Sequence, residues 1–418
     1  MPKKVLADVV VIGGGPAGMA AALGARESGA KIVFLLERGD ELGGILNQCI
    51  HAGFGVQRFG EELTGPEYAG IYKDRLASSS IEVMTSTLVC EVNRDGYVKA
   101  VNRSGIWEIS ARSVVMAMGC RERTRDMIRI PGTRPSGVFT AGLVQYMVNV
   151  DGLLPGKEAV ILGSGDIGLI VARRLELEGV RVNAVVEIRD SLSGLVRNYV
   201  QCLLDFNIPM LFSHTVTGIR GEDRVEAVKI SKVDNSWRPI KGASQWMECD
   251  CLLLSVGLIP ENELTQRLGI PICPESGGPY IDEKGTTEIP HIFACGNVSS
   301  VFDLVDYVSI ISERTGSAAA LKNPPAPVSF ILECGGGVGL VVPQRIRERG
   351  EGDIFVRPAT ALRDGNIRFQ RGERIIYEKP ISICRPSEMI RIPSRGIEWP
   401  HETGKVKIEI DGEPVQGI

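Results

Sequence analysis

Short apolar runs and glycine-rich turns alternate along the first three quarters of the chain. An apolar run ends in the turn GGGPAG at residues 13–18, and a helix-like stretch and a second apolar run follow. This order predicts strand, turn, helix and strand, which is one nucleotide-binding βαβ unit. The same order recurs from Ala159, where the run AVIL leads through the turn GSGDIG and a helical stretch to a run that ends at Glu187. The chain therefore contains this supersecondary unit twice.

Each unit is followed by a meander and by an apolar strand that closes on glycine. Turn signals within 81–117 predict hairpin strands that lead into a strand ending at Gly119. A similar meander over 215–245 leads into a strand ending at Gly257. We expect the second unit to be inserted between two parts of the first.

The last part of the chain has a different pattern. The linker NPPAP begins at Asn323 and is stiff and incompatible with a helix. Beyond it, short β-like runs separated by Gly, Asp and Pro predict a small all-β domain. This domain is rich in Arg rather than Lys, which fits either an interface or a solvated β surface.

The predicted architecture is α/β, with two Rossmann-like three-layer domains, one inserted in the other, and a small C-terminal all-β domain. We expect an FAD-binding domain over 1–120 and 258–322, an NAD(P)-binding domain over 121–257, and a C-terminal domain, a candidate interface module, over 323–418. A chain of 418 residues fits this division, because single cores rarely grow beyond about 250–300 residues.

Charge and hydropathy exclude several classes of partner. The formal net charge of -4 and the pI of about 5.8 leave no basic field for nucleic acid. No run approaches the roughly 20 apolar residues of a membrane span, and the N-terminus lacks the pattern of a secretory signal. The sequence therefore predicts a cytoplasmic protein without a transmembrane segment, and attachment to a membrane through a partner stays open.

The ten cysteines include no CxxC pair. Cys249 and Cys251 fall on one face of a predicted strand, but no second Cys or His pair completes a metal site. We expect buried or redox thiols rather than structural disulfides, and no metal.

The first glycine turn has the G-x-G-x-x-G spacing, with Gly13, Gly15 and Gly18. Such glycines allow a tight turn and a close approach of a pyrophosphate to helix N–H groups. The pattern alone is weak, but Glu37 lies about 19 residues beyond Gly18 at the end of the next strand, where a carboxylate can bind an adenosine ribose. These residues predict a dinucleotide site.

The second turn repeats this spacing with Gly163, Gly165 and Gly168, and Glu187 again follows about 19 residues on. Two units of this kind predict two dinucleotides. An acid at Glu187 favours NAD over the 2'-phosphate of NADP, although Arg189 keeps NADP open.

Over about residues 5–322 the chain resembles the FAD-dependent pyridine nucleotide-disulfide reductase superfamily. The resemblance rests on VIGGGPAG with Glu37, AMG at 117–119, GSGDIG, SVGLIPEN and HIFACGN at 291–297. The superfamily's usual Gly-Asp is Gly296-Asn297 here. The segments GGILNQCIHAGFG, EELTGPEYA, GCRERTR and PSGVFTAG are similar to a subgroup that includes flavoproteins associated with glycerol-3-phosphate dehydrogenases. More distant members are flavin subunits of amine, opine and cyanide-forming dehydrogenases.

The resemblance implies FAD and NAD(H), with NADP(H) second, as cofactors. It also implies that the last helix, expected to carry Asp303, Asp306 and Tyr307, directs its N-terminus at the flavin, where the helix dipole stabilises charge gained on reduction. The residues assigned to FAD are Gly13, Gly15, Pro16, Ala17, Gly18, Glu37, Arg38, Gly44, Gln48, Val89, Gly119, Gly296, Asn297, Tyr307 and Val308. Those assigned to NAD are Gly163, Gly165, Asp166, Ile167, Gly168, Glu187 and Gly257.

Cys49 is the most ambiguous residue. Disulfide reductases place two cysteines after the Gly-Gly at this point, whereas this chain has only Cys49. A thiol beside a helix start has a lowered pKa, and His51 is a candidate proton acceptor. Redox catalysis, packing against the flavin and a plain structural thiol all stay open for Cys49.

We expect the enzyme to move a hydride between nicotinamide and flavin and to pass electrons to a partner subunit or a small acceptor. One alternative is the flavin subunit of a glycerol-3-phosphate, opine or amine dehydrogenase complex. Another is a non-catalytic scaffold with structural nucleotides. A homodimer and a hetero-complex are both open.

Overall fold

The computed structural model describes residues 2–321 and 324–415, which form two compact units. Of the described residues, unit 1 comprises 2–120, 260–321 and 324–414, and unit 2 comprises 121–259 together with 415. The predicted linker residue Asn323, the expected domain boundary at 322–323 and the chain end at 416–418 lie outside the described residues. The expected division into three domains stays a prediction.

A seven-stranded sheet forms the centre of unit 1. Its order is β5-β2-β1-β8-β7-β6, and β19 pairs with the second half of β8. Strands β5, β2, β1, β8 and β19 are parallel, whereas β7 and β6 form the predicted antiparallel meander. The strands are β1 (Lys3–Ile12), β2 (Val33–Leu36), β5 (Glu82–Met84), β6 (Leu88–Val92), β7 (Tyr97–Asn102), β8 (Gly105–Met116) and β19 (Ile292–Ala294).

Helices α1 and α9 pack against this sheet and against each other. Small residues let their backbones approach, because a Cβ on Gly316 would lie 1.8 Å from the oxygen of Ala21. The helical elements of unit 1 are α1 (Pro16–Glu27), η1 (Gly44–Gln48), α2 (Val56–Phe59), α3 (Gly65–Ala77), α8 (Glu263–Arg267), η3 (Gly296–Val298) and α9 (Val305–Ala320), with the short strands β3 (Ala52–Phe54) and β4 (Leu63–Thr64) between η1 and α3.

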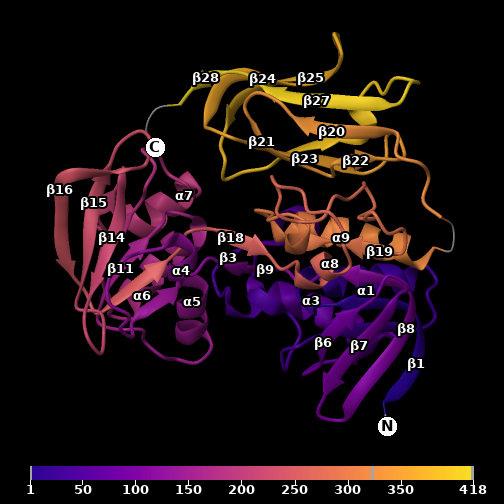
Figure 1. Cartoon of the computed structure of the whole chain (residues 1–418), viewed down its shortest axis with the longest axis horizontal. Helices are drawn as coiled ribbons and strands as arrows, with labels where there is room; N and C mark the ends of the chain where they lie inside the picture. Colours follow the sequence, from indigo (N-terminus) through magenta and orange to yellow (C-terminus); the bar gives the residue numbers. More distant parts are fainter. Residues whose placement is uncertain (1, 322–323, 416–418) are drawn as a thin grey trace. The chain divides into compact units, whose positions relative to one another are not determined.

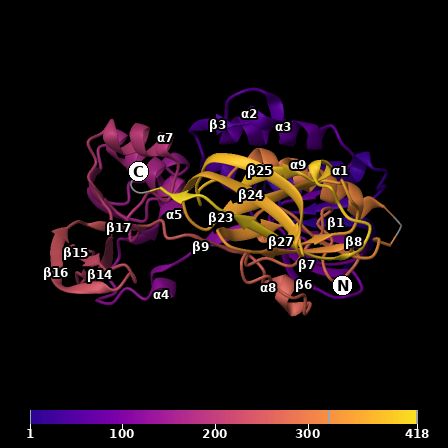
Figure 2. The same cartoon turned by 90° about the horizontal axis from the view of Figure 1, so that it is seen from above.

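The C-terminal strands form two further sheets in unit 1, which lie over α9 in both views (Figures 1 and 2). Leu340, Val342, Phe355 and Met389 belong to the same apolar core as the nucleotide-binding fold. The larger sheet contains β22 (Arg345–Ile346), β20 (Phe330–Cys334), β27 (Gly404–Ile410), β24 (Leu362–Arg371), β25 (Arg374–Cys384) and β28 (Glu413–Pro414); the smaller contains β21 (Val338–Val342), β23 (Asp353–Pro358) and β26 (Ile390–Pro393), and η4 spans Ser394–Gly396.

Unit 2 contains a five-stranded parallel sheet, order β10-β17-β11-β12-β13, and a three-stranded antiparallel sheet, order β14-β15-β16. Its strands are β10 (Val138–Thr140), β11 (Glu158–Leu162), β12 (Arg181–Val186), β13 (Met210–Leu211), β14 (His214–Arg220), β15 (Ala227–Val233), β16 (Pro239–Glu248) and β17 (Cys251–Leu254). Its helices are α4 (Arg125–Ile128), α5 (Ala141–Asn149), α6 (Asp166–Leu177), α7 (Val196–Tyr199) and η2 (Val200–Leu204). Strands β9 (Cys120–Glu122) and β18 (Leu258–Pro260) pair where the chain passes between the units.

The structure is thus a mixed α/β fold with two Rossmann-like units and additional β-rich sheets at the C-terminus, as the hydrophobic pattern predicts. In the described part of the chain, no helix is long and apolar enough to cross a membrane.

Candidate dinucleotide-binding sites

The first glycine turn connects β1 to α1 and has one open face. A Cβ on Gly13, whose φ is +106°, would lie 2.4 Å from the oxygen of Ala117, and one on Gly18 would lie 1.7 Å from the oxygen of Gly13. These two glycines therefore allow close packing within the protein. A Cβ on Gly15 would meet no atom within 4 Å, and no side chain caps the N-terminus of α1. This face offers free helix N–H groups and room for a pyrophosphate.

Glu37 follows β2 and is bonded to the same turn. Its Oε2 accepts a hydrogen bond from the N–H of Gly14 at 2.6 Å, and its Oε1 accepts one from the N–H of Gly39 at 2.6 Å. Each carboxylate oxygen keeps acceptor capacity for a ribose hydroxyl. Arg38 beside it is exposed.

Segments that are distant in sequence converge at the N-terminus of α1. A Cβ on Gly44 would lie 3.1 Å from the Cα of Gly15. A Cβ on Gly296 would lie 2.5 Å from the Cβ of Ala17 and 3.4 Å from Cγ1 of Val308. The structure thus brings together residues from three of the segments that the resemblance assigns to FAD.

Asn297 holds the loop that leads from η3 to α9. Its Oδ1 accepts a hydrogen bond from the N–H of Phe302 at 3.0 Å, and its Nδ2 lies 3.6 Å from Sγ of Cys120 as donor. The amide therefore presents a donor where the superfamily's Asp has only acceptors. Gly119, the neighbour of Cys120, has a φ of +73° and open space at its Cβ position.

Gln48 and Val89 lie on the segments around the first turn. Gln48 is buried at the end of η1. Val89 is half-buried on β6, which begins just after Thr87, and the N–H of Thr87 donates to the carbonyl of Glu37 at 2.8 Å. Val89 therefore lies on the strand that follows the contact with Glu37.

Two residues at the start of the last helix, Asp306 and Tyr307, have partners within the protein. The carboxylate of Asp306 is buried and accepts hydrogen bonds from the N–H groups of Gly55 at 3.2 Å and Arg58 at 2.8 Å, so it caps α2 rather than facing a ligand. The ring of Tyr307 lies 5.2 Å from that of Phe355 on the C-terminal strand β23. The helix that carries both residues, α9, begins without a side-chain cap.

The expectation of a low pKa for Cys49 was wrong. Cys49 lies at the end of η1 rather than at a helix start, and burial raises the pKa of its thiol to about 12. His51 turns its Nδ1 to the carbonyl of Ala52 at 3.1 Å. The thiol is therefore protonated near neutral pH. All ten cysteines lie in the described part of the chain and are free thiols.

The second turn, between β11 and α6, repeats the geometry of the first. A Cβ on Gly163, whose φ is +102°, would lie 2.1 Å from the oxygen of Ser255, and one on Gly168 would lie 2.7 Å from the oxygen of Gly163. The nearest atom to a Cβ on Gly165 would be Oγ of Ser255, at 3.6 Å. The middle glycine is again the least crowded of the three, because a Cβ there would make only an ordinary van der Waals contact.

Glu187 accepts hydrogen bonds equivalent to the two that Glu37 accepts in the first turn, and it accepts two more from side chains. Its Oε2 accepts from the N–H of Ser164 at 2.9 Å, and its Oε1 accepts from the N–H of Arg189 at 3.0 Å. The hydroxyls of Ser164, at 2.6 Å, and Ser193, at 2.9 Å, also donate to Oε2. Glu187 is 4% exposed, so Oε1 is the oxygen with acceptor capacity left for a ligand.

The loop before α7 is bonded to the first turn of α6. Oδ1 of Asp166 accepts hydrogen bonds from the N–H of Leu195 at 2.8 Å and from Nδ2 of Asn198 at 2.7 Å. Asp166 therefore orders this loop. Ile167 is half-buried in the same helical turn, and Gly257, at the end of the strand segment after β17, has a φ of +96° and open space at its Cβ position.

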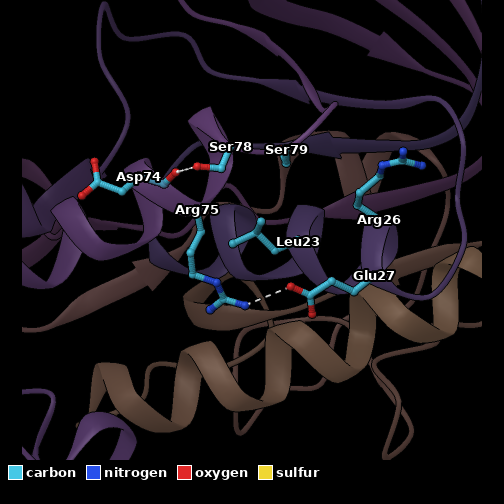
Figure 3. Close-up of a pocket in the computed structure, with 7 residues that line it drawn as sticks. All are labelled: Leu23, Arg26, Glu27, Asp74, Arg75, Ser78 and Ser79. Atoms are coloured by element: carbon cyan, nitrogen blue, oxygen red, sulfur yellow. Dashed lines mark hydrogen bonds and ion pairs between the residues drawn. The ribbon is translucent and has the colours of Figure 1, made fainter.

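An open surface depression lies elsewhere, between the C-terminal ends of α1 and α3 (Figure 3). The side chains of Arg75 and Glu27 form an ion pair of 3.1 Å across it. Because the glycine turn is at the opposite end of α1, this depression is separate from the candidate FAD site.

Sequence reasoning did not single out several residues that order these sites. Ser164 and Ser193 hold Glu187, and Asn262 in the segment SVGLIPEN donates to the carbonyls of Gly277 and Val298, both at 2.9 Å. A serine or asparagine carries no spacing signal, so only the fold reveals these partners. Among the described residues, no group of three or more His, Cys, Asp or Glu could hold a metal ion.

Two glycine turns, each bonded to an acid at the end of the next strand, define a two-dinucleotide oxidoreductase fold. Residues 7–315 match the family described as pyridine nucleotide-disulphide oxidoreductase, and the chain belongs to this family. The family binds FAD and NAD(P)H, so the chain is a flavin-dependent pyridine-nucleotide oxidoreductase.

Individual relatives are distant. The chain is 26% identical over 411 residues to the hydrogen cyanide synthase subunit HcnB of Pseudomonas protegens, covering 88% of this chain and 81% of the relative. It is 27% identical over 306 residues to the CoA-dependent NAD(P)H sulfur oxidoreductase of Pyrococcus abyssi, covering 71% and 63%. The crystal structure of T. acidophilum thioredoxin reductase has a TM-score of 0.61 at 21% identity, covering 75% of this chain and 98% of that one, which shows a common fold.

Proposed function

We propose that this chain moves a hydride between NAD(H) and a bound FAD and passes the electrons to a partner protein or a small acceptor. The observation that carries the proposal is the glycine turn bonded to an acid, which occurs twice with the same geometry. In both turns the middle glycine is the one with room for a Cβ, and both acids, Glu37 and Glu187, accept a hydrogen bond from the turn and one from the residue two positions on. A second site that had lost nucleotide binding would not need to keep this arrangement.

In the proposal, unit 1 binds FAD through residues at the start of α1. The N–H groups after Gly15 take the pyrophosphate, Glu37 takes the adenosine ribose, and Gly44, Gly296 and Asn297 line the path onward. Bound FAD would supply the hydride chemistry, while the protein supplies position and field. The open face at Gly15 supports this assignment.

Unit 2 binds NAD(H) in the same way, with Gly165 at the pyrophosphate and Glu187 at the ribose. The hydroxyls of Ser164 and Ser193 donate to Oε2 and hold the carboxylate in place. An anion held at this position repels a 2'-phosphate, which supports NAD over NADP.

The electrons are proposed to leave by a route other than a dithiol next to the flavin. The segment after Gly44 offers a single thiol, Cys49, and its raised pKa opposes nucleophilic attack at neutral pH. Cys49 and His51 therefore remain weak candidates for catalysis, with packing at the flavin the better role for Cys49.

The second candidate function is the flavin subunit of a larger dehydrogenase, as the expected link to glycerol-3-phosphate, opine or amine substrates implies. The similarity to a hydrogen cyanide synthase subunit over most of both chains favours a partner protein. No comparison supports a link to glycerol-3-phosphate in particular. In this proposal, the C-terminal sheets are a candidate contact for the partner.

The test is rapid anaerobic mixing of the purified holoprotein with NADH and, separately, NADPH, while the flavin absorbance is followed. Fast bleaching with NADH and slow bleaching with NADPH is the expected result. Failure of both nucleotides would refute the main proposal and leave the subunit function, which is tested by adding candidate substrates with a partner.

A variant of the second glycine turn tests whether flavin bleaching by NADH depends on unit 2. Gly165→Ala should raise the NADH concentration needed for half-maximal bleaching about tenfold, because its methyl group fits beside Ser255 but would take up space where the pyrophosphate is proposed to lie. The FAD content should not change. Unaltered NADH dependence in this variant would show that the second turn is not the nicotinamide nucleotide site.

A further inference from the structure

The C-terminal sheets contact the loop between Asn297 and α9, and one of these contacts is a half-buried arginine. Arg357 on β23 donates from Nη2 to the carbonyl of Val301 at 2.9 Å and from Nη1 to the carbonyl of Pro386 at 2.6 Å. Its side chain is 22% exposed. Burial lowers the pKa of this guanidinium, but an arginine stays charged at neutral pH.

The charge of Arg357 has one acidic neighbour, at a long distance. Oδ1 of Asp303 lies 3.9 Å from Nη2 of Arg357, and Oδ2 of Asp303 accepts a hydrogen bond from the N–H of Met389 at 3.1 Å. Only 16% of the Asp303 side chain is exposed to solvent, while the residue as a whole is exposed. Most of its solvent-exposed area therefore belongs to its backbone atoms. The carboxylate therefore turns to the C-terminal strands.

Aromatic rings fix the same loop against β23. The ring of Phe355 lies 5.5 Å from that of Phe302, edge to face, and 5.2 Å from that of Tyr307. Arg391 lies over Tyr307 at 5.5 Å. The N–H of Phe302 in turn donates to Asn297. The loop that precedes the uncapped start of α9 is thus held on one side by Asn297 and on the other by the C-terminal strands.

We infer that Arg357 sets the redox potential of the flavin through its positive charge, which its bond to the carbonyl of Val301 holds at this loop. The inference rests on the proposed function, which puts FAD along the start of α1, past Asn297 and up to α9. Reduction adds negative charge to the flavin, so a half-buried cation bonded to this loop favours the reduced form, and the carboxylate of Asp303 opposes this effect. The C-terminal sheets then take part in the redox chemistry as well as in any docking.

The test measures the two-electron midpoint potential of the bound flavin by dye equilibration in three variants of the full chain. Arg357→Met removes the charge, Arg357→Lys keeps it, and Asp303→Asn removes the opposing charge while its amide oxygen can still accept from Met389. At fixed potential, we expect the ratio of reduced to oxidised flavin to fall about tenfold in Arg357→Met, a shift of about 30 mV to more negative values. The potential should move to more positive values in Asp303→Asn and stay near the parent value in Arg357→Lys.

Opposite shifts separate an electrostatic role from a structural one. Loss of a purely structural contact would loosen the loop in every variant and move the potentials in the same direction or leave them unchanged, and either result would overturn the inference. If Arg357→Met loses FAD or unfolds, the comparison of Arg357→Lys with Asp303→Asn still decides. Absence of bound FAD in the parent protein would instead refute the proposed function.

Discussion

Two neighbouring glycines of the first turn should respond to alanine in opposite ways. Gly18→Ala puts a methyl group 1.7 Å from the oxygen of Gly13, inside the protein, whereas Gly15→Ala puts it where no atom lies within 4 Å. Gly15 also has an extended backbone, with φ −73° and ψ −174°, which alanine adopts without strain. The pair therefore separates a packing glycine from a ligand-facing one.

The magnitudes follow from the space at each position. Gly18→Ala forces α1 away from the turn, and we expect a loss of about 3 kcal/mol in the free energy of unfolding. Gly15→Ala should change that free energy by less than about 1 kcal/mol, in the stabilising direction, because alanine restricts the unfolded chain. Gly15→Ala should instead weaken FAD binding: the dissociation constant of FAD should rise about tenfold or more, which is a loss of about 1.4 kcal/mol in binding free energy.

The assay combines urea unfolding of the apoprotein, followed by circular dichroism, with fluorescence titration of FAD. Gly70→Ala is a matched control, because a Cβ there also meets open space, its φ is not positive, and it lies within α3 rather than in the glycine turn. Normal FAD affinity in Gly15→Ala would show that the cofactor does not approach this face. Equal destabilisation by Gly15→Ala and Gly18→Ala would refute the packing argument itself.

Three further outcomes are expected. At pH 8, iodoacetamide should label the exposed Cys90 and spare Cys49, because a thiol pKa of about 12 leaves roughly one thiolate in 10,000; peptide mass mapping checks this, and fast labelling of Cys49 would contradict it. Ser193→Ala should weaken NADH binding about fivefold, or about 1 kcal/mol, through the lost bond to Glu187, with FAD affinity as the unaffected control. Asp306→Ala should lower the free energy of unfolding by about 2 kcal/mol, because two backbone N–H groups lose their acceptor, and Asp306→Asn should recover part of this loss. Urea unfolding measures both; equal free energies of unfolding in the parent and in Asp306→Ala would argue against capping.

Local patterns predicted the two nucleotide units because each is encoded by contiguous residues. An apolar run, three spaced glycines and an acid about 19 residues on are close in sequence and close in space, so Glu37 and Glu187 could be assigned before any fold was known. The C-terminal β strands were predicted for the same reason, from alternation and turns.

Partners from distant segments could not be predicted in this way. The sequence places Asp306 in the first turn of the last helix, but it does not show that its carboxylate caps α2, about 250 residues earlier in the chain. The pKa of Cys49 was misjudged because the sequence does not show that η1 ends at this residue, nor how deeply the thiol is buried. Burial and capping depend on tertiary packing, which a local pattern does not contain.

The contacts of Arg357 change what the C-terminal strands imply about partners. Arginine enrichment fitted either an interface or a solvated β surface. In the structure, Phe355 and Met389 share the apolar core of the nucleotide-binding fold, and Arg357 bonds directly to the loop before α9. Removing these strands would expose that core and release the loop, so a truncated chain should lose FAD as well as any partner. Truncation therefore cannot separate docking from catalysis in this protein. Single charge changes at Arg357 and Asp303 can, because they leave the apolar core intact and alter only the electrostatic field and the loop contacts at one end of α9.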